Sequence, residues 1–100
     1  MNYHFAIAVV TRDGKVLGYS APMEITREEL FNALKLGYDS YRIVEAVVKE
    51  LGYKPPRNIT VKTEDYEVTV FNRGTRFVIA VFREETIPVA TTRSTALAEA

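Results

Sequence analysis

Apolar residues recur with a helical period over one long segment of the chain, from Thr26 to Leu51. Residues three and four positions apart lie on the same side of an α-helix. One such stripe consists of Leu30, Leu34, Tyr38, Tyr41, Val44 or Glu45, Val48 and Leu51. A second stripe consists of Phe31, Ala33, Leu36, Ile43, Ala46 and Val47. The pattern predicts a helix whose apolar surface is wider than one sheet face requires.

Both ends of this predicted helix carry recognisable signals. Thr26 and Glu29 have the spacing of a capping box, in which each side chain bonds the backbone N–H of the other residue. Gly52 is placed to end the helix in a left-handed conformation, and Pro55 follows shortly afterwards. Gly37 costs about 1 kcal/mol relative to Ala inside a helix, so a kink or break near Gly37 and Tyr38 is one alternative.

The segments on either side of the helix have the patterns of β-strands. Tyr3–Thr11 and Arg76–Phe82 contain unbroken apolar runs, which are typical of strands with apolar surroundings on both faces. Asn58–Thr63 and Tyr66–Phe71 alternate between apolar and polar residues, as half-buried or edge strands do. Val16–Ser20 is short and is predicted to return from the first strand.

Turn residues connect these strands and limit the possible topologies. Arg12-Asp13-Gly14-Lys15 and Asn72-Arg73-Gly74-Thr75 are predicted to be hairpin turns. We therefore expect an α+β fold with a five-stranded antiparallel sheet in the order 2-1-5-4-3 and a long helix on one face. Pairing of the first strand with the fifth is inferred from burial, and either direction of that pair is possible. The second face requires another cover, either the C-terminal tail 84–100 as a short helix or another protein chain.

Composition narrows the class of protein. The 100 residues are expected to form a single domain, 1–100. Thirteen basic and thirteen acidic residues give a net charge of zero, which argues against a general electrostatic grip on nucleic acid or anionic lipid. The chain has no cysteine, which excludes disulfides and thiol catalysis and fits a cytoplasmic location. Its longest apolar run, Phe5–Val10, is too short to span a bilayer.

The sequence contains no recognisable catalytic, cofactor or metal-binding pattern. His4 is the sole histidine, and a metal site or an acid–base pair needs partners. The acidic pairs Glu28-Glu29, Glu64-Asp65 and Glu84-Glu85 fall at a helix cap, a turn and a strand exit, where surface charge explains them. Tyr53–Arg57 is the nearest approach to a nucleic-acid patch, but it has a single aromatic residue. We therefore expect no enzyme, no cofactor and no nucleic-acid partner.

The order of elements resembles that of the roadblock/dynein light chain group. The most similar segments are Ala8–Leu17, which contains the Arg-Asp-Gly turn, and the strand meander Ile59–Phe82. That group usually begins with a helix before the first strand, whereas here the first strand begins close to Met1. Longin domains lack that first helix, and profilins share the broad architecture. The resemblance implies a roadblock/longin/profilin-like fold.

The resemblance also implies a role. Such proteins are non-enzymatic adaptors that commonly dimerise through the helix and the neighbouring edge strand, and they regulate small GTPases, motors or filaments. We expect a homodimer with a protein partner and no membrane insertion. An accessory protein of an archaeal actin-like cytoskeleton and a small-ligand-sensing domain are the alternatives. The matching interface residues are Leu36, Tyr38, Ile43, Val47, Asn58, Thr60 and Lys62.

Overall fold

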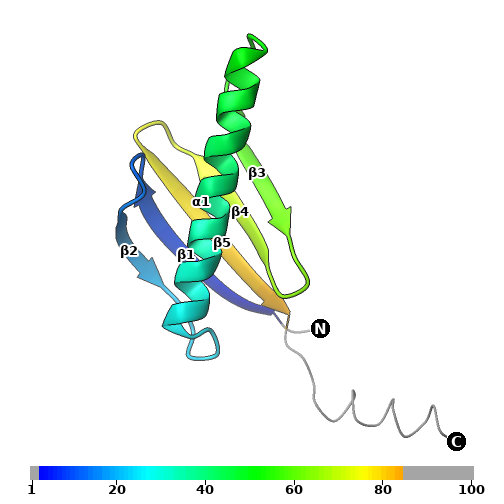
Figure 1. Ribbon diagram of the computed structural model, residues 1–100. Helices are drawn as coiled ribbons and strands as arrows, with labels where there is room; N and C mark the ends of the chain where they lie inside the picture. The colour runs from blue at the N-terminus through cyan, green and yellow to red at the C-terminus, as the bar shows by residue number, and fades with distance from the viewer. Residues whose placement is uncertain (1–2, 85–100) are drawn as a thin grey trace, which may run out of the picture.

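The computed structural model describes residues 3–84, which form a five-stranded sheet with one long helix across one face (Figure 1). In chain order the elements are β1 (Tyr3–Thr11), β2 (Val16–Ser20), α1 (Arg27–Glu50), β3 (Asn58–Lys62), β4 (Glu67–Asn72) and β5 (Arg76–Glu84). The sheet order is β2-β1-β5-β4-β3, as predicted. The expected role of the C-terminal tail as a cover concerns residues beyond Glu84, outside those that the structure describes.

Strands β1 and β5 lie together in the middle of the sheet and pair over the full length of both. Their register runs from Tyr3 opposite Glu84 to Thr11 opposite Arg76, and the pair is antiparallel. This resolves the direction that the sequence left open. β5 continues past its predicted end at Phe82 because the first residues of β1 provide partners for two more residues.

The predicted capping signals are both present in α1. The Thr26 side chain accepts a hydrogen bond of 3.1 Å from the backbone N–H of Glu29, and the Glu29 carboxylate accepts one of 2.9 Å from the backbone N–H of Thr26. At the other end, Gly52 has a φ of 82° and Tyr53 N–H donates to the carbonyl of Val48. The Gly52 N–H also donates to the carbonyl of Lys49. These two hydrogen bonds form the Schellman motif, with which many helices end.

The helix is continuous through Gly37, so the possible break does not occur. A Cβ atom at this position would lie 2.7 Å from Val68 Cγ1 of β4, which is far inside contact distance. Glycine therefore lets the middle of α1 rest directly on the sheet. The core formed in this way consists of Ala6, Ala8, Val10, Ile25, Leu30, Ala33, Leu34, Tyr41, Val68, Val70, Phe77, Ile79 and Val81.

The sheet face opposite α1 is also apolar, as the unbroken runs predict. Alternation along β1 sends Phe5 and Ile7 to this face, and both are exposed. The Phe5 and Phe82 rings lie side by side with their centroids 5.0 Å apart, and Phe71 of β4 is exposed on the same face. Within residues 3–84, α1 covers one apolar face of the sheet, and the other apolar face is left exposed.

Candidate protein interface

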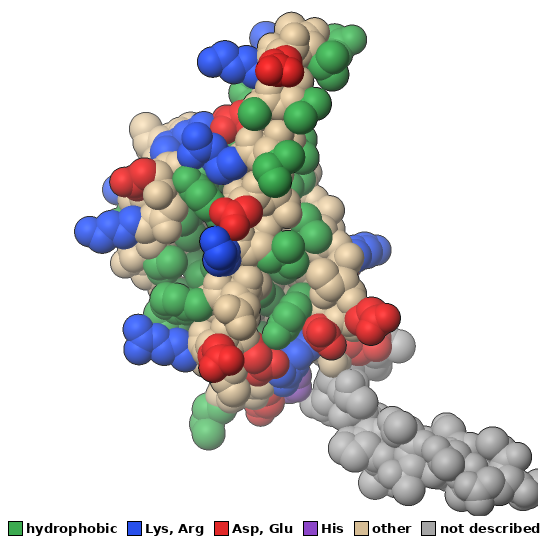
Figure 2. Space-filling model, in the orientation of Figure 1, with side chains coloured by type: hydrophobic (Ala, Val, Ile, Leu, Met, Phe, Trp, Pro, Cys, Tyr) green, Lys and Arg blue, Asp and Glu red, His purple; other side chains and the backbone are tan. Residues whose placement is uncertain are grey.

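An apolar stripe runs along the flank of α1 that lies beside β3, half-buried at Leu36 and exposed from Ile43 onward. Leu36, Ile43 and Val47 are spaced by seven and four residues, which places them on one side of the helix. Ile43 is 65% exposed and Val47 is 52% exposed, and Leu51 continues the stripe at the C-cap. Apolar side chains gather along this flank up to the part of α1 that projects beyond the sheet (Figures 1 and 2). We call Leu36, Ile43, Val47 and Leu51 the α1 stripe.

The free edge of the sheet lies next to this stripe. β3 is the terminal strand, so one side of its backbone has no strand partner within residues 3–84. Asn58, Thr60 and Lys62 are exposed and point to the face away from α1, where they are opposite Phe71, Thr69 and Glu67. The Thr60 and Thr69 hydroxyls are 3.0 Å apart, and Lys62 Nζ is 3.7 Å from Glu67 Oε1.

Six of the seven predicted interface residues therefore lie around one edge of the molecule, on the α1 stripe or on β3. Tyr38 is the exception. Its ring packs edge-on to Phe77, and its hydroxyl donates a 2.6 Å hydrogen bond to the carbonyl of Arg12. Tyr38 thus lies between α1 and the β1–β2 turn, on the flank of the helix away from the α1 stripe. The spacing of Tyr38 places it on the first stripe with Leu34 and Tyr41, and the position of the β1–β2 turn beside that stripe could not be read from the sequence.

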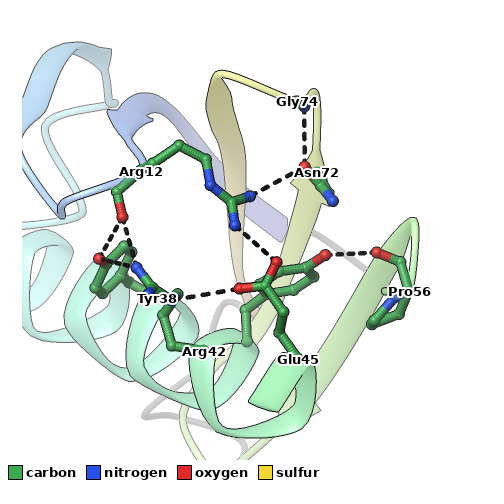
Figure 3. Close-up of polar contacts among 8 residues, drawn as sticks. Arg12, Tyr38, Arg42, Glu45, Pro56, Asn72 and Gly74 are labelled. Carbon is green, nitrogen blue, oxygen red and sulfur yellow. Dashed lines mark hydrogen bonds and ion pairs between the residues drawn. The ribbon is translucent and has the colours of Figure 1, made fainter. Parts of the chain in front are cut away.

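Tyr38 belongs to a polar network that ties the β1–β2 turn to the helix (Figure 3). Arg12 Nη2 lies 2.7 Å from Glu45 Oε2, and its guanidinium lies 4.7 Å from the centre of the Phe77 ring. Arg42 donates to the Arg12 carbonyl at 2.7 Å and pairs with Glu45 at 3.4 Å. Glu45 thereby binds two arginines from separate elements. The sequence showed the charges but gave no sign that they converge.

Tyr41 anchors the segment that leads into β3. Its side chain is fully buried, and its hydroxyl donates a 2.6 Å hydrogen bond to the carbonyl of Pro56. Burial raises the pKa of the Tyr41 hydroxyl, so this group remains a hydrogen-bond donor at neutral pH. This bond fixes the start of β3 against α1 and so positions the edge beside the α1 stripe.

A cleft of about 450 Å³ opens on the other flank of α1, between the helix and the β1–β2 hairpin. Apolar side chains form part of its lining, namely Val10, Val16, Phe31 and Leu34. Asp13, Asn32, Lys35 and Asp39 supply polar groups around it. The helix packs chiefly over β3, β4 and β5. In β2, only Val16 is even partly buried, so this edge of the sheet is open.

Two of the groups considered for chemistry, His4 and Glu29, have structural partners at the N-terminal end of the helix. His4 Nδ1 lies 3.9 Å from Glu24 Oε1. Arg83 bonds the Glu29 carboxylate at 2.7 Å and the Glu24 carbonyl at 2.5 Å, which ties the end of β5 to the start of α1. The pKa of Glu29 is lowered, first by the hydrogen bond from the Thr26 backbone and further by Arg83. Glu29 therefore caps the helix and, through Arg83, joins the start of α1 to the end of β5.

Potential metal ligands do not cluster in the part of the chain that the structure describes. Between residues 3 and 84, no three His, Cys, Asp or Glu side chains are grouped so that they could hold a metal ion. No helix in the same range combines the length and the apolar character needed to cross a membrane.

Comparisons with known proteins bear on the fold. No protein-family model and no curated protein matches the sequence. The structure is similar to a roadblock/LC7 domain from Streptomyces avermitilis, with 11% identity, 96% of this chain and 79% of that chain covered, and a TM-score of 0.65. It is also similar to the gliding protein MglB from Thermus thermophilus, with 19% identity and a TM-score of 0.61. That match covers 85% of this chain and 64% of the MglB chain.

A third similar structure is described as MglB with tetrameric arrangement. It is 18% identical, the match covers 88% of this chain and 65% of that chain, and the TM-score is 0.62. This chain therefore spans slightly less than two thirds of each of these two MglB chains. The shared strand order, the single long helix and these similarities together lead to one assignment. The chain has the roadblock/longin-like fold.

Proposed function

We propose that this chain is a non-enzymatic interaction module that pairs with a second copy through the α1 stripe and the β3 edge. The pair would act as a scaffold or regulator for a protein partner such as a small GTPase or a motor. The observation that carries the proposal is the exposure of Ile43 and Val47 next to an unpaired strand edge. Burying exposed apolar side chains and unpaired backbone groups favours association.

Similarity to other proteins supports the proposed role as an interaction module. The structural neighbours include MglB, one structure of which is described as tetrameric and another as a gliding protein. Roadblock-type proteins serve as adaptors of small GTPases and motors, as the sequence resemblance implies. The Tyr41 bond to Pro56 holds the two parts of the proposed surface, α1 and the start of β3, in fixed relation.

The proposal is tested by the mass of the protein in solution. Light scattering and sedimentation at tens of micromolar should give the mass of a dimer or a higher oligomer for the natural sequence. Ile43→Glu combined with Val47→Glu should shift the population toward the monomer, because two carboxylates would be buried without partners. The circular dichroism spectrum and the unfolding transition should remain those of a folded protein, since both side chains are exposed.

A matched control makes the same change of charge on the opposite flank of the helix. Lys35 lines the cleft on that flank and pairs with Asp39 at 3.1 Å. Lys35→Glu changes the net charge by the same two units and should leave the mass unchanged. A natural protein that is strictly monomeric, or equal loss of association in both variants, would refute the proposed pairing.

The partner class is tested separately. Small GTPases and actin-like proteins encoded in the same genome would be purified and titrated against the chain, each GTPase in its GDP form and with a GTP analogue. Binding that depends on the nucleotide would support the regulatory role. Binding to an actin-like filament alone would favour the cytoskeletal alternative.

A further inference from the structure

The two edges of the sheet differ in what lies beside them. β3 is flanked by the convex, apolar α1 stripe, whereas β2 is flanked by the 450 Å³ cleft under α1. β2 reads Val-Leu-Gly-Tyr-Ser, with neither a charged residue nor a proline. Edge strands of natural sheets usually carry charged residues or proline, because an edge without them readily pairs with other extended chains. β2 therefore has the character of an edge that accepts a strand.

The cleft provides room for side chains of that added strand. Val10 and Val16 line it from the sheet, Leu34 lines it from the helix, and the Phe31 ring contacts Tyr19 edge-on at 5.5 Å. Its volume lies within the range of roughly 300–1,000 Å³ that is usual for ligand sites. Alternate residues of a strand point to the same face, so every second side chain of a bound segment would turn toward the cleft.

The rim of the cleft indicates which charge the occupant carries. Asp13 and Asp39 both line it, and Lys35 pairs with Asp39 at 3.1 Å. The hydrogen bond from the Thr11 hydroxyl lowers the pKa of the Asp13 carboxyl, so Asp13 is ionised at neutral pH. Asp13 has no ion-pair partner within 4.0 Å among residues 3–84. A cationic side chain next to an apolar one would complement this rim.

We propose that β2 and the adjoining cleft form a docking groove for an extended peptide segment of a protein partner. The segment adds to the sheet beside β2, places large apolar side chains in the cleft and carries an Arg or Lys that reaches Asp13 and Asp39. This deepens the proposed function by naming the kind of partner segment, and it uses the edge opposite to the one proposed for self-association. Main-chain bonds supply affinity in this mode, and the side-chain cleft supplies specificity.

The first test selects ligands without assuming a sequence. A displayed library of random eight-residue peptides is panned on the full chain, and enriched peptides are synthesised with a fluorescent label for anisotropy titration. We expect enrichment of peptides with apolar residues at alternating positions and a neighbouring Arg or Lys. Failure to enrich any peptide, or enrichment of acidic peptides, overturns the proposal.

Variants then locate the binding. Asn32 is exposed at the cleft, so Asn32→Trp should block it and weaken binding about tenfold or more, whereas Asn32→Ala should have little effect. Asp13→Asn with Asp39→Asn should weaken a peptide that contains Arg but not the same peptide with Gln in its place. Equal effects on both peptides would show that Asp13 and Asp39 do not recognise the charge of the peptide, and would refute that part of the inference.

Spectroscopy separates this groove from the proposed pairing surface. In nitrogen-15 spectra, the selected peptide should perturb amides of residues 16–20 and 31–39 and leave residues 58–62 unchanged. N-methylation of alternate peptide residues should abolish binding in one register only, since alternate N–H groups of the added strand face β2. Shifts confined to residues 58–62, or no effect of methylation in either register, would overturn strand addition beside β2.

The two proposals can fail independently. Ile43→Glu with Val47→Glu should leave peptide affinity unchanged even where it removes self-association. If instead Asn32→Trp reduces the mass of the protein in solution, the groove holds a second copy of this chain and not a partner peptide. If thermal shifts respond to a panel of small metabolites and to none of the peptides, the occupant is a small ligand.

Discussion

Gly37 in the middle of α1 rests directly on Val68 of β4. A side chain added at Gly37 would place its Cβ atom 2.7 Å from Val68 Cγ1 and 3.0 Å from Val70 Cγ2. Real side chains are not found at the shorter of these distances, so the contact leaves no room for any residue but glycine. The depth at which the helix lies on the sheet is therefore set at this point.

We expect Gly37→Ala to destabilise the protein by about 1–3 kcal/mol, because the extra methyl overpacks the core. The sign is the opposite of the gain of about 1 kcal/mol that Ala gives over Gly in an open helix position. Urea unfolding followed by circular dichroism measures the difference. Gly18→Ala is the matched control, since a Cβ at Gly18 meets no atom within 4 Å. A stabilised Gly37→Ala variant would show that the helix is free to lift from the sheet.

Loss of the N-cap should weaken the whole domain, because α1 is the only helix in residues 3–84 and covers one sheet face. Thr26→Ala removes the hydroxyl that accepts the Glu29 N–H bond, and we expect a loss of about 1 kcal/mol in the free energy of unfolding. Thr26→Ser keeps the hydroxyl and should be close to the natural protein. Equal stability of Thr26→Ala and Thr26→Ser would contradict a role for this bond.

The other half of the capping box should make stability depend on pH. The pKa of Glu29 in the folded protein lies below its ordinary value of 4.5, owing to the Thr26 backbone bond and to Arg83. A lowered carboxyl pKa contributes stability above the ordinary value, and this contribution is lost as pH falls. The stability difference between the natural protein and Glu29→Gln should therefore shrink below about pH 4.5. Denaturant titrations from neutral pH to pH 3 test this, and a constant difference would contradict it.

Tyr38 should prove to be a positioning residue and not part of a protein interface. Tyr38→Phe removes the hydrogen bond to the Arg12 carbonyl, with an expected loss of about 0.5–1.5 kcal/mol. Amide exchange in the β1–β2 turn should accelerate, because one of two bonds to that carbonyl is gone. The mass of the protein in solution should stay the same. A change in association caused by Tyr38→Phe alone would place Tyr38 at an interface after all.

Local chemistry made much of the fold predictable. The capping box at Thr26 and Glu29, the stop at Gly52 and the glycines of the two hairpin turns act within a few residues, so the sequence displays them directly. The strand order followed from the unbroken apolar runs of β1 and β5, because two-sided burial belongs to the middle of a sheet. These signals need no knowledge of distant contacts.

The rest depended on contacts between distant residues. Whether Gly37 breaks the helix or lets it contact β4 closely is decided by Val68, which lies in another element. Likewise, the side of the helix that meets the β1–β2 turn decides that Tyr38 faces Arg12 and that Ile43 faces outward. The cleft arises from the offset of α1 toward β3, and the sequence pattern of a helix does not encode such an offset.

The pairing of β1 with β5 has a consequence for how the protein folds. The two middle strands come from opposite ends of the described chain, so Tyr3 meets Glu84 only after every other element has been synthesised. Closing so long a loop is slow compared with forming a hairpin. During synthesis, the first strand must therefore wait with both of its apolar faces unsatisfied, and this interval is when the nascent chain is most exposed to aggregation or to chaperones.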